Sequence, residues 1–186
     1  IFGLVTYATK GVSFGAIEPA IPKMIIPKIN GFPTIILWAV AAIVIVWFIW
    51  NKTTFGKNLY AVGGNPEAAA VSGISVFGVT MGAFILAGIL YGFGSWLECA
   101  RMVGSGSAAY GQGWEMDAIA ACVVGGVSFT GGIGKISGVV VGVLIFTVLI
   151  YSLTILGIDT NLQFVFEGII IITAVTLDCL KYVQKK

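Results

Sequence analysis

The chain has 186 residues, of which 58% are hydrophobic and 10% are charged, and its net charge is +2. Soluble domains carry about 25% charged residues, so this composition indicates a membrane protein and excludes an ordinary soluble domain. The sequence has no histidine, which removes the commonest general base and metal ligand. Cys99, Cys122 and Cys179 lie far apart in mostly apolar sequence and are interpreted as small apolar residues. We therefore expect no catalytic residue, no cofactor, no metal site and no nucleic acid partner.

The first third of the chain predicts one complete membrane span. The apolar residues Ile1–Ala8, which carry no initiator methionine, are expected to be the remnant of an earlier span, so that the chain is the C-terminal part of a longer protein. Residues 10–33 hold four of the five prolines and predict an external loop, because proline breaks helices and strands. Thr34–Trp50 is long and apolar enough to cross the bilayer.

Residues Asn51–Ser75 form a polar stretch, NKTTFGKNLYAVGGNPEAAAVSGIS, between two apolar runs. About two to six residues are enough to join neighbouring elements. We therefore expect this loop to contact something outside the hydrocarbon.

A short helix, Pro66–Ser72, is predicted inside this loop. Asn65 is a suitable N-cap, and proline suits the first helical position. Glu67 stands at the amino end, where the helix dipole favours an acid. Gly73 can adopt the positive φ that ends many helices.

The residues around this helix favour a docking element. Gly63 and Gly64 are predicted to form the turn before it. Its small alanine side chains suit a groove on a partner, and it lacks the large apolar face of a helix that lies on lipid. We therefore favour docking to another protein.

The rest of the chain predicts further spans. Their bounds are Val76–Leu97, Ile136–Leu156 and Leu162–Leu180, with Trp114–Val127 as a shorter segment that either crosses or re-enters. Within the first of them, Gly78-x-x-x-Gly82 and Gly88-x-x-x-Gly92 suggest a tightly packed bundle.

Basic residues predict the orientation. Those that flank the polar loop and those at the C-terminus are Lys52, Lys57, Lys181, Lys185 and Lys186. Both regions are therefore expected in the cytoplasm, which requires an even number of crossings between them. Counting Trp114–Val127 as a crossing gives four, whereas a re-entrant segment would leave the C-terminus outside.

Few polar residues are candidates for substrate binding or proton transfer. Glu98 and Arg101 are interpreted as loop charges that form an i,i+3 pair, with acid–base work or sugar binding as the alternative. Asp117 lies inside an apolar segment, where a carboxylate indicates function by default. Gln163, Glu167 and Asp178 fall on about one face of the last span and favour hydrogen bonds between helices over a substrate path.

The stretch Gly131–Ser137 superficially resembles a phosphate-binding loop. Its Gly134-Lys135 pair is followed by isoleucine, whereas such loops need Ser or Thr there and a preceding strand. We therefore expect a tight turn, and no ATP binding by this chain alone.

Several motifs resemble one transporter family. Glu67-Ala68-Ala69-x-x-x-Gly73 resembles the E-A-A-x-x-x-G coupling motif of ABC importer permeases. The strings from Thr54 to Ala69 and from Asp117 to Gly132 are similar to signatures of the branched-chain amino acid/ribose-type permease family, in its sugar branch. The resemblance runs over Trp50–Lys186 and is specific as a set.

This resemblance implies an all-α, polytopic membrane helix bundle of the type II-like ABC importer class, with residues 1–186 as one permease domain. It implies the transmembrane subunit of an ATP-driven importer for a hexose such as galactose or a methyl-galactoside, in a bacterial inner membrane. The implied partners are cytoplasmic ATP-binding subunits, a second permease copy, a periplasmic sugar-binding protein and membrane lipid. ATP hydrolysis is expected in the separate subunits, so the chain itself is not an enzyme.

The resemblance also assigns site residues. The ATPase-coupling set is Gly63, Gly64, Asn65, Pro66, Glu67, Ala68, Ala69 and Gly73. The resemblance does not assign the residues of the substrate path, for which Glu98 and Asp117 are our own candidates.

An ion-coupled transporter or channel is the alternative. Asp117 and Glu167 would then be ion or proton sites, but the docking loop does not fit that class. A membrane enzyme is weakly supported, because there is no histidine and no paired nucleophile and base.

Overall fold

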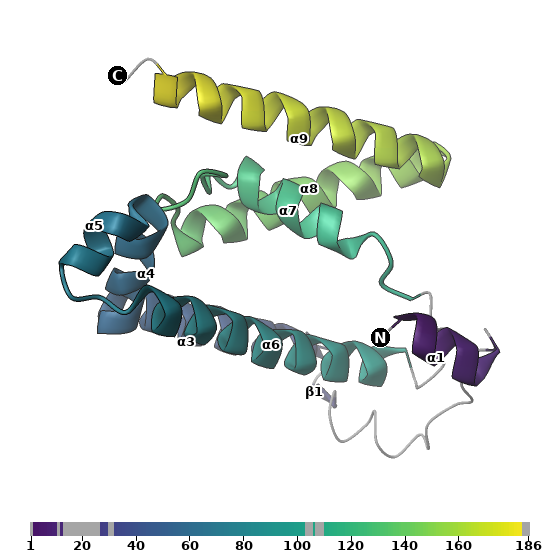
Figure 1. Ribbon diagram of the computed structural model, residues 1–186. Helices are drawn as coiled ribbons and strands as arrows, with labels where there is room; N and C mark the ends of the chain where they lie inside the picture. The colour runs from purple at the N-terminus through teal and green to yellow at the C-terminus, as the bar shows by residue number, and fades with distance from the viewer. Residues whose placement is uncertain are drawn as a thin grey trace. The chain divides into compact units, whose positions relative to one another are not determined.

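The computed structural model describes residues 2–10, 12, 27–29, 32–102, 106 and 110–183. Within these residues the chain forms eight helices and one pair of two-residue strands, so the predicted all-α class is confirmed (Figure 1). The helices are α1 (Phe2–Thr9), α3 (Ile35–Lys52), α4 (Thr54–Gly64), α5 (Pro66–Val71), α6 (Val76–Arg101), α7 (Trp114–Val124), α8 (Ile136–Ile155) and α9 (Thr160–Val183). The strands are β1 (Lys28–Ile29) and β2 (Phe32–Pro33).

Three helices, α3, α6 and α8, are long and apolar enough to cross a membrane, as the sequence predicts. The fourth predicted span forms α9, whose apolar part, Thr160–Thr176, is shorter. The ambiguous segment forms α7, an 11-residue helix. At 1.5 Å per residue it is about 17 Å long, roughly half the thickness of the hydrocarbon.

Most of the predicted Pro-rich loop lies outside the described residues. Its described end contains β1 and β2, which pair antiparallel with Lys28 opposite Pro33. The hydroxyl of Thr34 donates a hydrogen bond to the carbonyl of Pro27 at 2.8 Å. These contacts hold the chain where it enters α3.

The chain divides into two compact units, described separately below. The first comprises Ile1–Val46 and Thr80–Gln112, and the second comprises Trp47–Val79 and Gly113–Lys186. In the first unit, Trp38 of α3 packs edge-on against Phe93 and Trp96 of α6, with ring centroids 6.0 and 6.1 Å apart.

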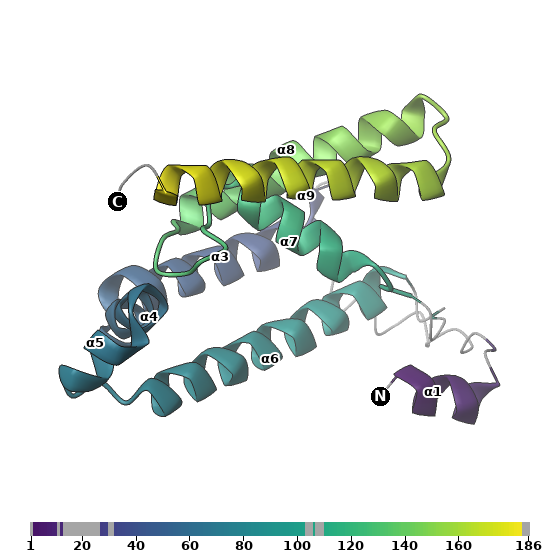
Figure 2. The same cartoon turned by 45° about the horizontal axis from the view of Figure 1, so that its top comes forward.

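The core of the second unit lies where α7 packs against α8 and α9 (Figure 2). Ala120, Ala121 and Phe146 are buried there. Gln163 of α9 is also buried, and its amide donates to Thr154 Oγ1 of α8 at 3.4 Å and to the carbonyl of Ile158 at 3.0 Å. The predicted hydrogen bonding between helices is thus confirmed for Gln163, whereas the side chain of Asp178 lies outside the described residues.

Glycines set the distance between α7 and α8. A Cβ atom at Gly138 would lie 2.3 Å from the carbonyl oxygen of Gly125, and one at Gly142 would lie 2.2 Å from that of Ala121. Real Cβ atoms do not approach backbone so closely, so these positions require glycine. Close helix packing therefore occurs at α7–α8. On α6, no described atom lies within 4 Å of a Cβ atom at Gly88 or Gly92.

Two predictions about the polar loop were wrong. Residues 54–64 form the helix α4, and Gly63 and Gly64 are its last two residues rather than a separate turn. The chain instead bends at Asn65, whose backbone is extended. The predicted loop is therefore two consecutive short helices.

Candidate functional site

The short helix α5 begins as the sequence predicts. The Asn65 side-chain oxygen accepts a hydrogen bond from the backbone N–H of Ala68 at 3.0 Å. Pro66 takes the first helical position, and Glu67 stands in the first turn. This pattern satisfies an amide that otherwise lacks a partner at a helix start.

The C-terminal end of α5 is also closed by backbone hydrogen bonds. Gly73 has a φ of +81°, and its N–H donates to the carbonyl of Ala70 at 3.0 Å. The next N–H, that of Ile74, donates to the carbonyl of Ala69 at 3.0 Å. These two bonds form a Schellman motif, for which glycine is the preferred residue. The predicted capped helix is therefore confirmed, with Ser72 as its C-cap.

The two faces of α5 differ in exposure. Glu67, Ala68 and Ala70 are exposed, and Val71 is 91% exposed. Ala69 is only 4% exposed and therefore lies on the buried face of α5. Within the second unit, α5 thus presents a small, mostly apolar surface with one acid.

The helix α4 is held at its first turn. The hydroxyl of Thr53 accepts from the backbone N–H of Gly56 at 3.2 Å and donates to the carbonyl of Ile49 at 2.6 Å. A Cβ atom at Gly56 would lie 2.1 Å from the carbonyl oxygen of Trp50. Glycine at this position therefore permits the sharp bend from α3 into α4.

The C-terminal end of α4 packs against the turn between α7 and α8. A Cβ atom at Gly63 would lie 2.7 Å from the backbone nitrogen of Gly132, and one at Gly131 would lie 2.6 Å from the carbonyl oxygen of Gly63. One turn earlier in α4, the hydroxyl of Tyr60 donates to the carbonyl of Gly134 at 2.7 Å. We call the set Tyr60, Gly63, Gly131, Gly132 and Gly134 the glycine joint.

The glycines of this joint can be read in the sequence, but nothing in the sequence indicates that Gly63 meets Gly131 and Gly132. Of the predicted coupling residues, Gly63 faces the chain's own turn, whereas a Cβ atom at Gly64 would have nothing within 4 Å. The turn predicted at Gly131–Ser137 is confirmed for its first part, with φ of +95° at Gly131 and +69° at Gly132, whereas its last two residues belong to α8. The helix α7 precedes this turn, where a phosphate-binding loop would have a strand.

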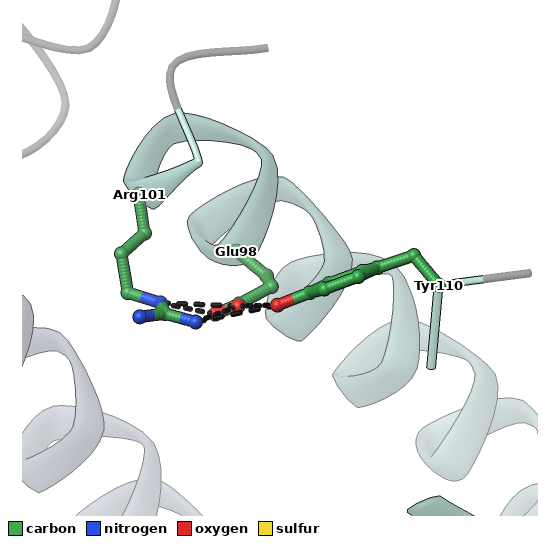
Figure 3. A network of polar contacts seen from close by, with 3 residues as sticks. All are labelled: Glu98, Arg101 and Tyr110. Atoms are coloured by element: carbon green, nitrogen blue, oxygen red, sulfur yellow. Dashed lines mark hydrogen bonds and ion pairs between the residues drawn. The ribbon is translucent and has the colours of Figure 1, made fainter. Parts of the chain in front are cut away.

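Glu98 lies in a polar network of the first unit (Figure 3). The Arg101 guanidinium pairs with it, with Nε 2.9 Å from Oε2, which confirms the predicted i,i+3 pair. The phenol of Tyr110 donates to the same carboxylate at 2.5 Å. This hydrogen bond to Glu98 raises the pKa of Tyr110. The Glu98 carboxylate is therefore already engaged by two partners.

Asp117 lies in the first turn of α7, in the second unit, and is half-buried. It lies near Glu167 on α9, which is 5% exposed. The pairing of these two acids follows from the packing of α7 on α9. The sequence shows each acid but not that they meet. The two candidate path residues thus lie in different units, each with its own partners.

Comparison with known proteins gives consistent matches. The family model described as branched-chain amino acid transport system / permease component matches residues 2–175. The galactose/methyl galactoside import permease protein of Treponema pallidum (strain Nichols) is 55% identical over 195 aligned residues, which cover 100% of this chain and 36% of that protein. The protein of the same name from Escherichia coli (strain K12) is 53% identical over 82% of this chain and 45% of its own length.

A less similar relative is named for a different sugar. The ribose import permease protein of Bacillus subtilis (strain 168) is 42% identical over 80% of this chain and 46% of its own length. The chain thus matches between 36% and 46% of the length of these three relatives. No solved structure matches it. The chain belongs to the branched-chain amino acid transport system / permease component family.

Proposed function

We propose that this chain forms part of the transmembrane subunit of an ATP-driven importer for a hexose such as galactose or a methyl galactoside. The observation that carries the proposal is α5, a six-residue helix capped at both ends and exposed along Glu67, Ala68, Ala70 and Val71. The most similar relatives described above are named as galactose/methyl galactoside import permeases, which supports the choice of sugar.

In this proposal α5 docks on a cytoplasmic ATP-binding subunit. The remaining partners are a second permease copy, a soluble sugar-binding protein outside the membrane, and lipid around the apolar helices. ATP is hydrolysed in the docked subunit. The relatives do not favour the alternative of an ion-coupled transporter or channel, since those described above are named as sugar import permeases.

The glycine joint supports the orientation in this proposal. Because α4 packs on the turn between α7 and α8, that turn lies on the same side of the membrane as α5. The helix α8 then crosses away from that side and α9 returns to it. The C-terminus and the docking helix therefore share the cytoplasmic side, as the lysine residues also predict.

Co-purification tests the docking role. The complete permease is expressed with its ATP-binding subunit, and Glu67→Lys and Ala68→Trp are each compared with wild type. Because both positions are exposed, these changes should leave the permease folded but reduce the recovered ATP-binding subunit about tenfold or more. Gln112→Lys, an exposed change in the first unit, is the control and should have no effect.

Sugar uptake into proteoliposomes is measured on the same samples. Wild-type recovery of the ATP-binding subunit together with wild-type uptake in both α5 variants would contradict the docking role. If the wild-type complex, supplied with ATP and its sugar-binding protein, takes up neither galactose nor methyl galactoside, the proposed substrate is wrong.

A further inference from the structure

The glycine joint connects the docking segment to the bundle without intervening side chains. The last turn of α4 meets the 131–132 backbone at Gly63, where a Cβ atom would lie 2.7 Å from the nitrogen of Gly132. From the other side, a Cβ atom at Gly132 would lie 2.6 Å from the Cα atom of Gly64. Two backbones in direct contact have no flexible side chain that could absorb a displacement.

A second contact fixes the direction of α4. Tyr60 and Gly63 are three residues apart, so they lie on the same face of the helix. The hydroxyl of Tyr60 bonds to the carbonyl of Gly134, two residues beyond the glycine pair of the turn. Two contact points one helical turn apart oppose rotation of α4 about either of them.

The turn itself is stiffened by local hydrogen bonds. The backbone N–H of Ser128 donates to the carbonyl of Ile133 at 2.9 Å, and that of Gly131 donates to the carbonyl of Ser128 at 3.3 Å. The hydroxyl groups of Ser128 and Thr130 lie 2.8 Å apart in a hydrogen bond. Ser128 is only 8% exposed. Because the turn is stiff, a displacement of it moves the attached helices α7 and α8 and does not merely deform the turn.

On its far side the turn is continuous with the close contact between α7 and α8. It links the C-terminal end of α7 to the start of α8, where Gly125 and Gly138 place their backbones in contact. Gly142 extends this contact to Ala121 one turn further along α8. The helix α7 also carries Asp117, which lies near Glu167 of α9.

We infer that the glycine joint is the mechanical link by which movement of the docking helix reaches the α7–α8 pair, with Tyr60 and Gly63 as positioning residues. The inference rests on the proposed docking of α5 and concerns what happens after docking. When the ATP-binding subunit moves α5, α4 moves with it. The joint then displaces the turn, and the turn moves α7 and α8 together.

The chain offers a matched pair of glycines for the test. Gly63→Ala introduces a methyl group into the joint, whereas Gly92→Ala introduces the same group on α6, where no described atom lies within 4 Å. Both variants are made in the complete permease, assembled with its ATP-binding subunits, reconstituted in proteoliposomes and supplied with its sugar-binding protein. The quantity measured is sugar transported per ATP hydrolysed, alongside recovery of the assembled complex.

For Gly63→Ala we expect the complex to assemble and to hydrolyse ATP while the ratio of sugar to ATP falls about tenfold. Gly92→Ala should keep the wild-type ratio. An unchanged ratio in Gly63→Ala, or an equal fall in Gly92→Ala, would overturn the inference. Failure of the proposed function is distinguishable, because the wild-type complex would then not assemble or would not transport sugar.

Tyr60→Phe keeps the joint testable if Gly63→Ala does not fold. This variant retains the ring and removes only the hydroxyl that bonds to Gly134. We expect a fall of about threefold in the ratio of sugar to ATP with normal complex recovery. A wild-type ratio in Tyr60→Phe would contradict the role of Tyr60 in transmission.

Discussion

The glycines of α6 and those around α7 and α8 look alike in sequence but differ in their surroundings. On α6, Gly88 and Gly92 are spaced for close helix packing, yet a Cβ atom at either would have no described atom within 4 Å. At Gly138 and Gly142 on α8 the same atom would lie 2.3 and 2.2 Å from a carbonyl oxygen. Spacing alone therefore does not identify a packing contact, and the first two of the four predictions below test this difference.

The largest effect is expected at Gly142. An added methyl group would meet the backbone of Ala121 and Gly125, which cannot yield as a side chain would. We expect Gly142→Ala to destabilise the permease by about 3 kcal/mol. Gly88→Ala should be neutral or slightly stabilising, because alanine is the better helix former. Denaturant unfolding of both purified variants in detergent measures the difference, and equal stabilities would break the comparison.

The second prediction separates the cost of backbone strain from the cost of a steric clash between helices. Gly132 has a φ of +69° and its Cβ position is blocked, whereas Gly126 has a φ of +81° with open space around it. Both alanine variants carry the strain of the left-handed region, about 1 kcal/mol. Only Gly132→Ala adds the clash with α4, so we expect about 2 kcal/mol in total. The same unfolding assay checks this. If Gly126→Ala loses as much stability as Gly132→Ala, the clash with α4 contributes nothing.

A smaller, local effect is expected at the cap of α5. Asn65→Ala removes the side-chain acceptor for the N–H of Ala68 and should weaken the helix by about 1 kcal/mol. Hydrogen exchange at the α5 amides should then be about fivefold faster. Asn65→Asp keeps an acceptor and should exchange at the wild-type rate. Unchanged exchange in Asn65→Ala would show that other contacts hold α5.

The smallest effect concerns the one side-chain hydrogen bond of the glycine joint. Tyr60→Phe should cost about 1 kcal/mol, the net value of a typical hydrogen bond. Tyr151→Phe is the matched control, since that side chain is 69% exposed on α8. Denaturant unfolding of both variants checks this, and a loss in Tyr151→Phe as large as in Tyr60→Phe would show that the Gly134 contact is not the cause.

Much of the fold follows from local sequence. The apolar runs predict α3, α6 and α8 because a membrane span needs little beyond length and hydropathy. The caps of α5 follow from Asn65, Pro66 and Gly73, since each residue acts on its own neighbours. These features depend on interactions within a few residues.

The features that the sequence does not reveal depend on contacts between distant segments. The helix α4 contains Gly56 and ends in two glycines, which are poor helix formers. It forms because Thr53 caps it and because its last turn packs on residues 131–134. The pairing of Asp117 with Glu167 likewise depends on the packing of α7 on α9.

The central claim, that α4 moves as one body with the start of α8, can be measured as a distance. Spin labels are placed at Gly64→Cys and Ser137→Cys, two accessible positions on α4 and α8, in a complete permease whose native cysteines are replaced by alanine. The distance between them is measured by pulsed electron paramagnetic resonance in the nucleotide-free complex and in the ATP-bound complex. We predict the same distance in both states. A distance that changes with nucleotide while sugar is transported would contradict the claim.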